Sequence, residues 1–482
     1  MRLEHLLAPS VYLPAAARAL DIAAITADSR RVVPGSLFVA VPGTRVDGGQ
    51  FVADAAARGA VAAIAEAEAS VPSGVAIPVV RVSNVRQALS EAAARFFGRQ
   101  PETIVAVTGT SGKTSVAEFT RQLFAASGRR AASLGTIGVV TPDYADYGSL
   151  TTPDPVTLHE TLARLCDEQV THLAMEASSH GLDQRRLDGV RLTAAAFTNL
   201  GRDHMDYHPT VAHYLQAKLR LLTELVPEGA PVVINSDGAC GCEAAAAARR
   251  AGRRVYSTGR AGDIVELQDV VQIGFRQRLT LSGATWKGRV EFPLVGAYQV
   301  ENALVAAGLV IATGEPADIV LPALAKLEGV KGRLEIVGEA AGGLGIVDYA
   351  HKPEALAAAL DACRPFATGR LVCVFGCGGD RDRGKRPIMG AIAAEKADVV
   401  IVTDDNPRTE VPSAIRAEIM QGSPGAREIG DREAAIRTAV AQMGPGDVVL
   451  VAGKGHETGQ IVGTTVLPFS DQDILKDALS RR

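Results

Sequence analysis

The chain has 482 residues, with 50 Lys and Arg against 54 Asp and Glu, and its formal net charge is -4. This balance excludes the strongly basic surface that nucleic-acid and anionic-membrane binding usually require, and no run of ~18 apolar residues indicates a membrane span. Charges and prolines interrupt the N-terminal stretch and the six cysteines are scattered, which favours a cytoplasmic protein without a signal peptide. The length predicts about two to four domains.

Short β-rich runs alternate with Ala- and Leu-rich helical runs along most of the chain, which predicts an α/β fold. In the first part, residues 36–43 favour a strand and residues 51–69 favour a helix. A strand is then predicted at 102–107, followed by a helix at 115–127 that ends at Gly128. Further strands are predicted at 172–178, 193–200 and 231–237.

A second parallel sheet is predicted in the last third of the chain, with helical segments such as 353–363 and 412–420 between its strands. Each strand ends in a polar cluster: DYAH, GCGGDRD, TDDNPR or AGKGHE. Because ligands bind at the carboxyl edge of open α/β sheets, these clusters predict a binding site. We place domain boundaries near residues 98 and 330, which gives the segments 1–98, 99–329 and 330–482.

The segment TGTSGKTS, residues 108–115, lies between a predicted strand and a predicted helix, where backbone N–H groups and the helix dipole favour phosphate. Lys113 can reach the terminal phosphates of ATP, and Thr114 can reach a magnesium ion. Val107 stands where the longer phosphate-loop pattern has its first glycine, so a Gly/Ser-rich turn without a ligand is the alternative. The nucleotide-binding residues expected here are Gly109, Thr110, Ser111, Gly112, Lys113, Thr114 and Ser115.

Long motifs follow one another along the whole chain. They are TGTSGKTS, TTPD (151–154), MEASSHGLDQRR (175–186), FTNLGRDHMDYH (197–208), VDYAH, GCGGDRDRGKRP, DDNPR and AGKGHE. In order and spacing they resemble the UDP-N-acetylmuramoyl-tripeptide ligases of the Mur ligase superfamily. The resemblance implies three α/β domains: a UDP-substrate domain at 1–98, a central ATP-binding domain at 99–329, and a Rossmann-like domain at 330–482 that delivers the amino acid.

The activity implied by the resemblance is ATP-dependent amide formation through an acyl phosphate, in the cytoplasmic synthesis of peptidoglycan precursors. The third residue would be added to UDP-N-acetylmuramoyl-L-alanyl-D-glutamate. The implied partners are small molecules: ATP with magnesium, the UDP-linked dipeptide and meso-diaminopimelate. Neither nucleic acid nor membrane insertion is expected, and we expect a monomer.

Phosphoryl transfer depends on positioning and charge neutralisation, so the protein must hold magnesium with hard oxygen ligands, to which one imidazole can be added. Glu176 and His204 are suitable, although a Glu at a strand end is often only solvated or paired. From periodicity alone Lys218 is an exposed helical lysine. The resemblance instead implies that Lys218 is carbamylated (N6-carboxylysine), which requires a neutral amine and a lowered pKa. It makes Thr114, Glu176, His204 and Lys218 the metal ligands, and Lys113, Glu176, His204 and Lys218 catalytic.

Resemblance also assigns two further sets of residues. For the UDP-linked dipeptide they are Ala27, Ser29, Thr44, Arg45, Val46, Thr151, Thr152, Ser178, Gln184 and Arg186. Outside the phosphate loop, ATP would contact Asn199, Asn302, Arg333 and Asp348. The chain departs from the family at Gln299, where Asn is usual, and at Lys352 and Glu354 in the VDYAH segment, which bears on the details of nucleotide binding.

The stretch TDDNPRTE, residues 403–410, can be read as an Asx-Pro turn or as a ligand-binding loop. Arg408 can bind a carboxylate through two N–H groups, while the side chains of Asp405 and Asn406 can accept from an ammonium. A zwitterion would satisfy both. In the family, DNPR marks the ligases that add meso-diaminopimelate. The implied contacts are Arg381, Asp405, Asn406, Pro407, Arg408, Gly453 and Glu457.

Three alternatives stay open from the sequence. The amine could be L-lysine or another diamino acid, or the chain could be a sister enzyme such as another Mur ligase or folylpolyglutamate synthetase. A protein of another class, a nucleotide-dependent switch that ligates nothing, would also use the phosphate loop. A ligase should release phosphate only when both acceptor and amine are present.

Overall fold

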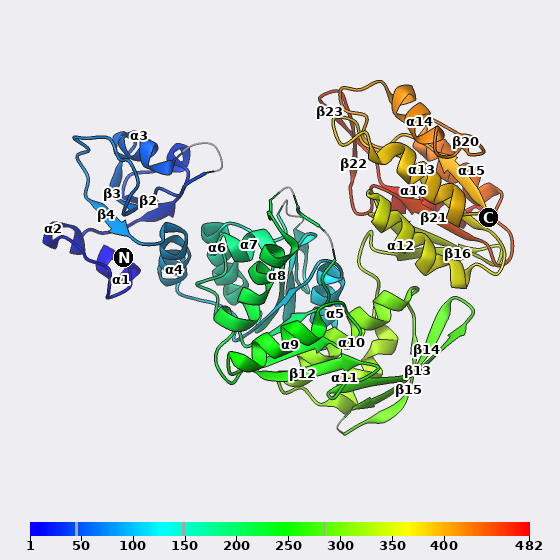
Figure 1. The fold of residues 1–482 in the computed structure, drawn as a ribbon, viewed down its shortest axis with the longest axis horizontal. Helices are drawn as coiled ribbons and strands as arrows, with labels where there is room; N and C mark the ends of the chain where they lie inside the picture. The colour runs from blue at the N-terminus through cyan, green and yellow to red at the C-terminus, as the bar shows by residue number, and fades with distance from the viewer. Residues whose placement is uncertain (44–46, 147–149, 202, 206, 284) are drawn as a thin grey trace. The chain divides into compact units, whose positions relative to one another are not determined.

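The structure is a computed structural model that describes residues 1–43, 47–146, 150–201, 203–205, 207–283 and 285–482 (Figure 1). The predicted site residues Thr44, Arg45 and Val46 lie outside these described residues. The chain divides into two compact units. One consists of Met1–Lys113, Thr120–Ser257 and Gly308–Glu315, and the other of Thr114–Phe119, Thr258–Ala307 and Pro316–Arg482. The domain boundaries near 98 and 330 stay a prediction.

The N-terminal part is a small parallel sheet with helices. Its strands are β1 (Ala24–Thr26), β2 (Ser36–Val39), β3 (Ala60–Glu66) and β4 (Val79–Val82), hydrogen-bonded in that order. Its helices are α1 (Leu3–Leu6), α2 (Ala15–Arg18), η1 (Ser29–Arg31), η2 (Gly48–Phe51), α3 (Val52–Ala57) and α4 (Val85–Phe97).

The prediction of one helix over 51–69 is wrong. Helix α3 ends just before Gly59, whose φ of 104° takes the chain out of the helix, and β3 follows. Most of β3 is buried, because it is an inner strand between β2 and β4. Alanine has high helix propensity, but its small side chain also fits a strand that is covered on both faces. Tertiary packing therefore overrides local propensity here.

The middle of the chain forms a larger sheet. Within the described residues of the first unit, the strand order is β11-β10-β5-β9-β6-β7-β8, and β11 to β6 run parallel. These elements are β5 (Thr103–Thr108), β6 (Ala131–Gly135), β7 (Gly138–Val140), β8 (Ala145–Asp146), α6 (Pro155–Asp167), β9 (His172–Glu176), α7 (Ser179–Asp183), β10 (Ala194–Phe197), α8 (Val211–Arg220), η3 (Leu221–Leu225), β11 (Pro231–Asn235), α9 (Gly241–Arg250) and β12 (Arg254–Gly259). The strands predicted at 102–107, 172–178, 193–200 and 231–237 are confirmed as β5, β9, β10 and β11.

Further elements lie between residues 113 and 326. They are α5 (Lys113–Ala126), which confirms the helix predicted at 115–127, β13 (Val265–Ile273), β14 (Arg276–Gly283), β15 (Lys287–Phe292), α10 (Ala297–Ala312), α11 (Ala317–Ala323) and η4 (Leu324–Lys326). Strands β13, β14 and β15 pair antiparallel in sequence order.

The C-terminal part is a doubly wound sheet in the order β16-β17-β21-β18-β19-β20, in which only β16 runs antiparallel among the described strands. Its elements are β16 (Glu335–Ala340), β17 (Gly343–Asp348), α12 (Pro353–Cys363), η5 (Arg364–Phe366), β18 (Leu371–Phe375), α13 (Lys385–Lys396), β19 (Val399–Val402), α14 (Pro412–Met420), β20 (Arg427–Glu428), α15 (Arg432–Ala441), β21 (Val448–Ala452), β22 (Gly459–Val462), β23 (Thr465–Pro468) and α16 (Asp471–Ser480).

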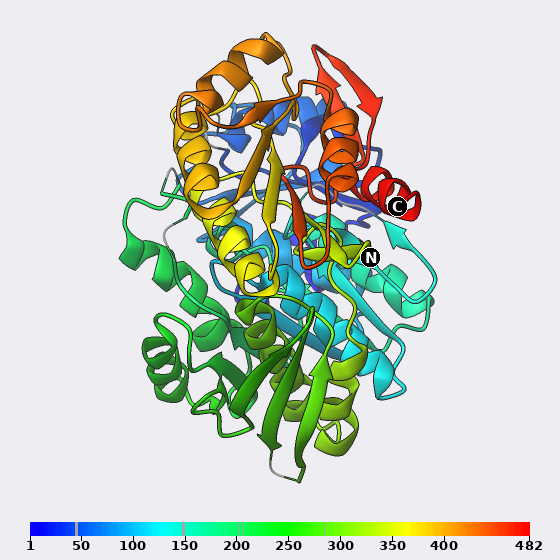
Figure 2. The same cartoon turned by 90° about the vertical axis from the view of Figure 1, so that its right-hand side faces the viewer.

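Helices cover both faces of this sheet (Figure 2). Alternate residues of its strands belong to two separate cores. One core packs against α12, α13 and α14, and the other against α15 and α16. Because both faces are buried, the strands read as continuous apolar runs, which is why they could be predicted from the sequence. The polar clusters follow β17, β18, β19 and β21, which places all of them at one edge.

No helix among the described residues is both long enough and apolar enough to cross a membrane.

Candidate functional site

The predicted phosphate loop lies between β5 and α5 and requires glycine at two positions. Gly109 and Gly112 have φ of 148° and 87°, and a Cβ atom on Gly109 would lie 1.9 Å from Thr198 Oγ1. The loop is therefore packed tightly against the end of β10. Asn199, at the same strand end, accepts a hydrogen bond from the backbone N–H of Ser111 through Oδ1 at 3.1 Å. The structure thus brings Asn199 to the phosphate loop.

Two lysines donate to the same carbonyl oxygen of this loop. Lys113 Nζ lies 2.9 Å from Gly109 O, and Lys218 Nζ lies 2.6 Å from it. Lys218 is only 1% exposed, so the alternative of an exposed helical lysine is wrong. Burial, together with the charge of Lys113, holds the pKa of Lys218 well below its usual value. A neutral amine at this position is what carbamylation needs.

Glu176 is buried at the end of β9, with 1% of its surface exposed. Its carboxylate accepts from the backbone N–H of Thr136 at 2.7 Å and from the Thr136 hydroxyl at 3.2 Å. The hydroxyls of Thr136 and Thr151 lie 2.9 Å apart, and Thr152 donates its hydroxyl to the carbonyl of Glu176 at 3.0 Å. The carboxylate is therefore held in place by Thr136, whose hydroxyl also contacts Thr151, one of the predicted dipeptide-binding threonines.

The remaining dipeptide residues of this region join the same cluster. Arg186 donates to the carbonyl of Thr152 at 2.6 Å and to Gln184 Oε1 at 2.8 Å. Ser178 caps α7 by accepting from the N–H of Gly181 at 3.0 Å. Thr151, Thr152, Ser178, Gln184 and Arg186 thus belong to one hydrogen-bonded cluster with Glu176 and Thr136. Ala27 is exposed and Ser29 is buried, and both follow strand β1 of the N-terminal sheet rather than the cluster at β9.

His204 adopts a left-handed backbone conformation, with φ of 56°. Its ring contacts that of His180 at a centroid distance of 4.8 Å. Across the described part of the chain, no group of three or more His, Cys, Asp or Glu side chains is arranged to hold a metal ion. The carboxylate of Glu176, the hydroxyl of Thr114 and one imidazole are still the donor types that suit magnesium. A carbamate on Lys218 would add the further oxygen ligand that these side chains lack.

The other predicted ATP residues lie in the second unit and contact one another. Asn302 donates to Gln299 Oε1 at 3.1 Å, and Gln299 Nε2 donates to the carbonyl of Arg333 at 3.1 Å. Gln299 is 1% exposed. Although the family usually has Asn at this position, the Gln299 side chain links two predicted nucleotide-binding residues, Asn302 and Arg333, through hydrogen bonds. The Arg333 guanidinium lies over the ring of Tyr349, 4.9 Å from its centroid.

Asp348 is buried at the end of β17 and accepts from the N–H of Leu334 at 2.7 Å. Burial raises the pKa of Asp348 to about 6, against the opposing charge of Arg333. The folded state therefore binds the proton more tightly than the unfolded state. The contribution of Asp348 to the free energy of unfolding is fully present below 3.8, the pKa of this carboxyl in the unfolded chain. It is lost as the pH rises through about 6, the pKa in the folded chain. Above that pH, the ionised carboxylate costs roughly 3 kcal/mol.

Replacing Asp348 with Asn should therefore raise the apparent Tm at about pH 7.5, with a gain that shrinks toward about pH 4.5. The amide keeps an oxygen for the Leu334 N–H and removes the buried charge. Thermal unfolding followed by circular dichroism across this range checks the effect. A variant that is no more stable than the parent chain at the higher pH would contradict it.

At the edge of the C-terminal sheet, a buried lysine joins the loops that follow β19 and β21. Lys454 is 0% exposed, and its Nζ donates to Asn406 Oδ1 at 3.0 Å and to Glu457 Oε2 at 2.9 Å. The Asn406 oxygen also accepts from the N–H of Ile461 at 2.9 Å, while Asn406 Nδ2 donates to Glu457 at 2.8 Å. Both lone pairs of the Asn406 oxygen are used here, one of them by the ammonium of Lys454, and its acceptance from a substrate ammonium stays a prediction. Asn406 also orients Glu457.

Asp405 and Gly453 meet beside this cluster. Asp405 is buried, and burial raises the pKa of its carboxyl, opposed by the charges of Arg432 and Lys454. Gly453 has φ of 119°, and a Cβ atom there would lie 2.6 Å from Asp405 Oδ2. Only glycine lets the backbone approach this carboxylate so closely.

Arg408, predicted to bind a carboxylate, and Arg381, another predicted diaminopimelate contact, lie near each other. A Cβ atom on Gly378 would lie 2.8 Å from Arg408 Nη1 and 3.9 Å from Arg381 Cγ. Arg408 Nη1 donates to the carbonyl of Gly379 at 2.8 Å, and Arg381 Nη1 donates to that of Asp380 at 3.3 Å. Arg381, Asp405, Asn406, Pro407, Arg408, Gly453 and Glu457 thus all belong to loops at one edge of the sheet.

Two supporting residues were not predicted from the sequence. Thr136 holds Glu176, but it stands outside every motif. Lys454 lies inside AGKGHE, and a lysine between two glycines after an apolar strand is a signal that could have singled it out.

Comparison with known proteins identifies the family of the chain. Three family models match: "Mur ligase family, catalytic domain" over residues 21–97, "Mur ligase middle domain" over 107–310, and "Mur ligase, glutamate ligase domain" over 332–455. The chain is 58% identical over 471 residues to the UDP-N-acetylmuramoyl-L-alanyl-D-glutamate--2,6-diaminopimelate ligase of Rhizobium meliloti, covering 98% of this chain and 96% of that protein. It is 57% identical over 486 residues to the protein of that name from Bradyrhizobium diazoefficiens, with 100% of both covered.

Solved structures agree in fold. A 2,6-diaminopimelate ligase structure superimposes with a TM-score of 0.76 and 32% identity, covering 100% of this chain and 99% of that one. The MurF ligase of Thermotoga maritima, solved with ADP, has a TM-score of 0.61 and 22% identity over 96% of this chain and 97% of that one. The chain therefore belongs to the Mur ligase family, in the branch whose members are named UDP-N-acetylmuramoyl-L-alanyl-D-glutamate--2,6-diaminopimelate ligase.

Proposed function

We propose that the chain is an ATP-dependent ligase that joins meso-diaminopimelate to UDP-N-acetylmuramoyl-L-alanyl-D-glutamate. The observation that carries the choice of amine is the cluster at the edge of the C-terminal sheet, where Arg381 and Arg408 lie near each other and Lys454 orients Glu457. Guanidinium and carboxylate groups together match a ligand with carboxylate and ammonium on one carbon. The relatives with 58% and 57% identity carry this activity in their names.

The reaction has two steps. A glutamate carboxylate oxygen first attacks the γ-phosphorus of ATP, forming an acyl phosphate and releasing ADP. A neutral amine of the second substrate then attacks the acyl carbon, phosphate leaves, and the nitrogen loses a proton. The glycine loop binds the phosphates through backbone N–H groups, with Lys113 beside them. The cluster around Glu176, with Arg186 and Gln184, holds the acceptor in position.

Magnesium, held by Thr114, Glu176, His204 and the Lys218 carbamate, would neutralise charge on the phosphates. The carbamate forms when the neutral Lys218 amine attacks carbon dioxide, making an N–C bond and losing a proton. The burial of Lys218 and the lowered pKa of its amine support this assignment.

On the nucleotide side, Asn199, Asn302, Arg333 and Asp348 would hold adenosine. Because the substrates are ATP and a UDP-linked precursor, we place the reaction in the cytoplasm, and we propose that a monomer performs it.

An amine panel tests the proposed substrate. The purified chain is given ATP, magnesium and the UDP-linked dipeptide with meso-diaminopimelate, L-lysine or L-ornithine, and phosphate release is measured. Release should require both the dipeptide and an amine, with meso-diaminopimelate preferred by at least about 100-fold, because lysine has no distal carboxylate to pair with Arg381 and Arg408. Preference for lysine would overturn the substrate, and release without either acceptor would support a switch protein instead.

A further inference from the structure

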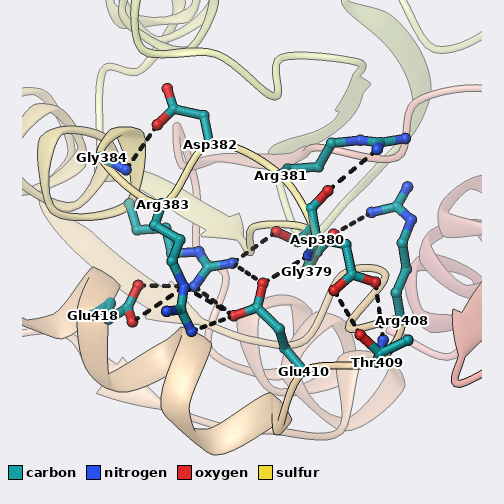
Figure 3. Close-up of polar contacts among 12 residues, drawn as sticks. Gly379, Asp380, Arg381, Asp382, Arg383, Gly384, Arg408, Thr409, Glu410 and Glu418 are labelled. Atoms are coloured by element: carbon teal, nitrogen blue, oxygen red, sulfur yellow. Dashed lines mark hydrogen bonds and ion pairs between the residues drawn. The ribbon is translucent and has the colours of Figure 1, made fainter.

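Two loops at the edge of the C-terminal sheet each carry one of the proposed carboxylate-binding arginines (Figure 3). Residues 376–384 follow β18 and carry Arg381, and residues 403–410 follow β19 and carry Arg408. The two strands are parallel neighbours, with Phe375 paired to Val402. The loops touch closely, since a Cβ atom on Gly379 would lie 1.9 Å from the carbonyl oxygen of Pro407.

Glu410 crosses from the second loop to the first. Its Oε1 accepts from the backbone N–H of Asp380 at 2.7 Å. Asp380 reciprocates, because its carboxylate accepts from the backbone N–H of Thr409 at 3.2 Å and from the Thr409 hydroxyl at 2.7 Å (Figure 3). Each loop thus offers a carboxylate to a backbone amide of the other. This pair of contacts fixes how far apart the loops lie.

A buried arginine holds Glu410 itself. Arg386, at 0% exposure, donates to Glu410 Oε1 at 2.9 Å, to Glu418 Oε2 at 2.8 Å and to the carbonyl of Gly378 at 3.2 Å. The hydrogen bond from Arg386 lowers the pKa of Glu410 to about 2, so the carboxylate stays ionised at neutral pH. A buried ion pair is weak evidence for stability, because desolvation offsets its attraction, but it does fix geometry.

The backbone is strained in both of the loops that Glu410 and Asp380 connect. Asp380 and Arg408 have φ of 53° and 51°, a region that residues other than glycine rarely adopt. Such conformations persist where the surroundings hold them, and they cluster at ligand-binding sites. Here the strain lies at one arginine of the proposed pair and next to the other.

We propose that Glu410 is a positioning residue for the amine substrate: by bridging the two loops it sets the spacing of Arg381 and Arg408, and with it the selectivity for a diamino acid that carries a distal carboxylate. This inference rests on the proposed function. Glu410 touches no ligand in this role and acts through the two arginines.

The test is Glu410→Gln, which keeps the size of the side chain and removes its charge. We expect the KM for meso-diaminopimelate to rise at least about tenfold, because charge-assisted contacts that order both loops are weakened. The kcat and the KM values for ATP and the UDP-linked dipeptide should stay within about twofold, since those substrates have other binding residues. The preference for meso-diaminopimelate over L-lysine should fall by the same factor as the KM rises.

Glu418→Gln is the matched control. Glu418 bonds the same Arg386 and lies 3.9 Å from Arg383, but among the described residues it accepts from no backbone N–H of either loop. Its KM for meso-diaminopimelate should therefore stay near that of the parent chain. Equal shifts in the two variants, or equal shifts for all three substrates of Glu410→Gln, would overturn the positioning role.

A second variant keeps the test decisive if Glu410→Gln does not fold. Asp380→Asn removes the charge of the group that accepts from the Thr409 N–H, which weakens the reciprocal contact, and it should raise the same KM without a change in the KM for ATP. An unchanged KM for meso-diaminopimelate would overturn the inference. The amine panel is run on the parent chain in parallel, so that failure of the positioning role can be distinguished from failure of the proposed function. A parent chain that rejects meso-diaminopimelate would contradict the proposed function itself.

Discussion

Replacing Arg408 with Ala should raise the KM for meso-diaminopimelate by roughly 10- to 150-fold, because a hydrogen bond to a charged group is worth ~1.5–3 kcal/mol. The KM for ATP should stay within about twofold, since Arg408 belongs to the amine-binding edge and not to the phosphate loop. Initial rates of phosphate release at varied concentrations of each substrate give both constants. Affinity for lysine, which has no distal carboxylate, should change little.

Arg408→Lys is the matched variant for this experiment. It keeps the positive charge and the same left-handed backbone position, with φ of 51°, but it loses the planar fork that binds two carboxylate oxygens. Its KM should fall between that of the parent chain and that of the Arg408→Ala variant. Equal effects of Arg408→Ala on the KM for ATP and for meso-diaminopimelate would exclude this arginine as the residue that reads the distal carboxylate.

Replacing Lys218 with Ala should lower kcat by roughly 100-fold or more, as loss of a group that organises transition-state charge usually does. Short carboxylates such as acetate or formate should restore part of the activity, because they supply the missing anion in the space left by the side chain. Removal of carbon dioxide from the buffer should slow the parent chain and leave Lys218→Ala unaffected. Mass spectrometry under non-acidic conditions should detect the carbamate.

Lys113→Ala provides the control for rescue. Lys113 donates to the same Gly109 carbonyl as Lys218, but its proposed role depends on positive charge, so carboxylates should not rescue its loss. Active protein whose Lys218 amine is unmodified would argue against carbamylation. Full activity of Lys218→Ala would remove the residue from the mechanism.

The sequence was sufficient where local pattern and tertiary packing agree. The strands before the phosphate loop and before TDDNPR are continuous apolar runs because both faces of each sheet are covered, and their polar ends identify the ligand edge. It was misleading at 51–69, where alanine suits both a helix and the buried strand β3. Periodicity also misplaced Lys218, because the burial of one helix face depends on which element packs against it.

The supporting contacts of the site could not have been predicted. Arg386 and Glu410 are 24 residues apart in sequence, and Asp380 and Glu410 are 30 apart. Each of these residues alone reads as an ordinary surface charge. Only the pairing of β18 with β19 brings their loops together. The same holds for Asn406 and Lys454, which are 48 residues apart and in whose hydrogen bond the amide oxygen accepts from a lysine of this chain.

The reciprocal contacts between Asp380 and Glu410 have a consequence for protein engineering. We expect that grafting DNPR alone into another ligase will not transfer a preference for meso-diaminopimelate, because the graft would lack the carboxylate and the backbone amide that the preceding loop contributes. We expect transfer to need both loops together with Arg386. Exchange of amine specificity between ligases of this architecture is in this sense a two-segment operation.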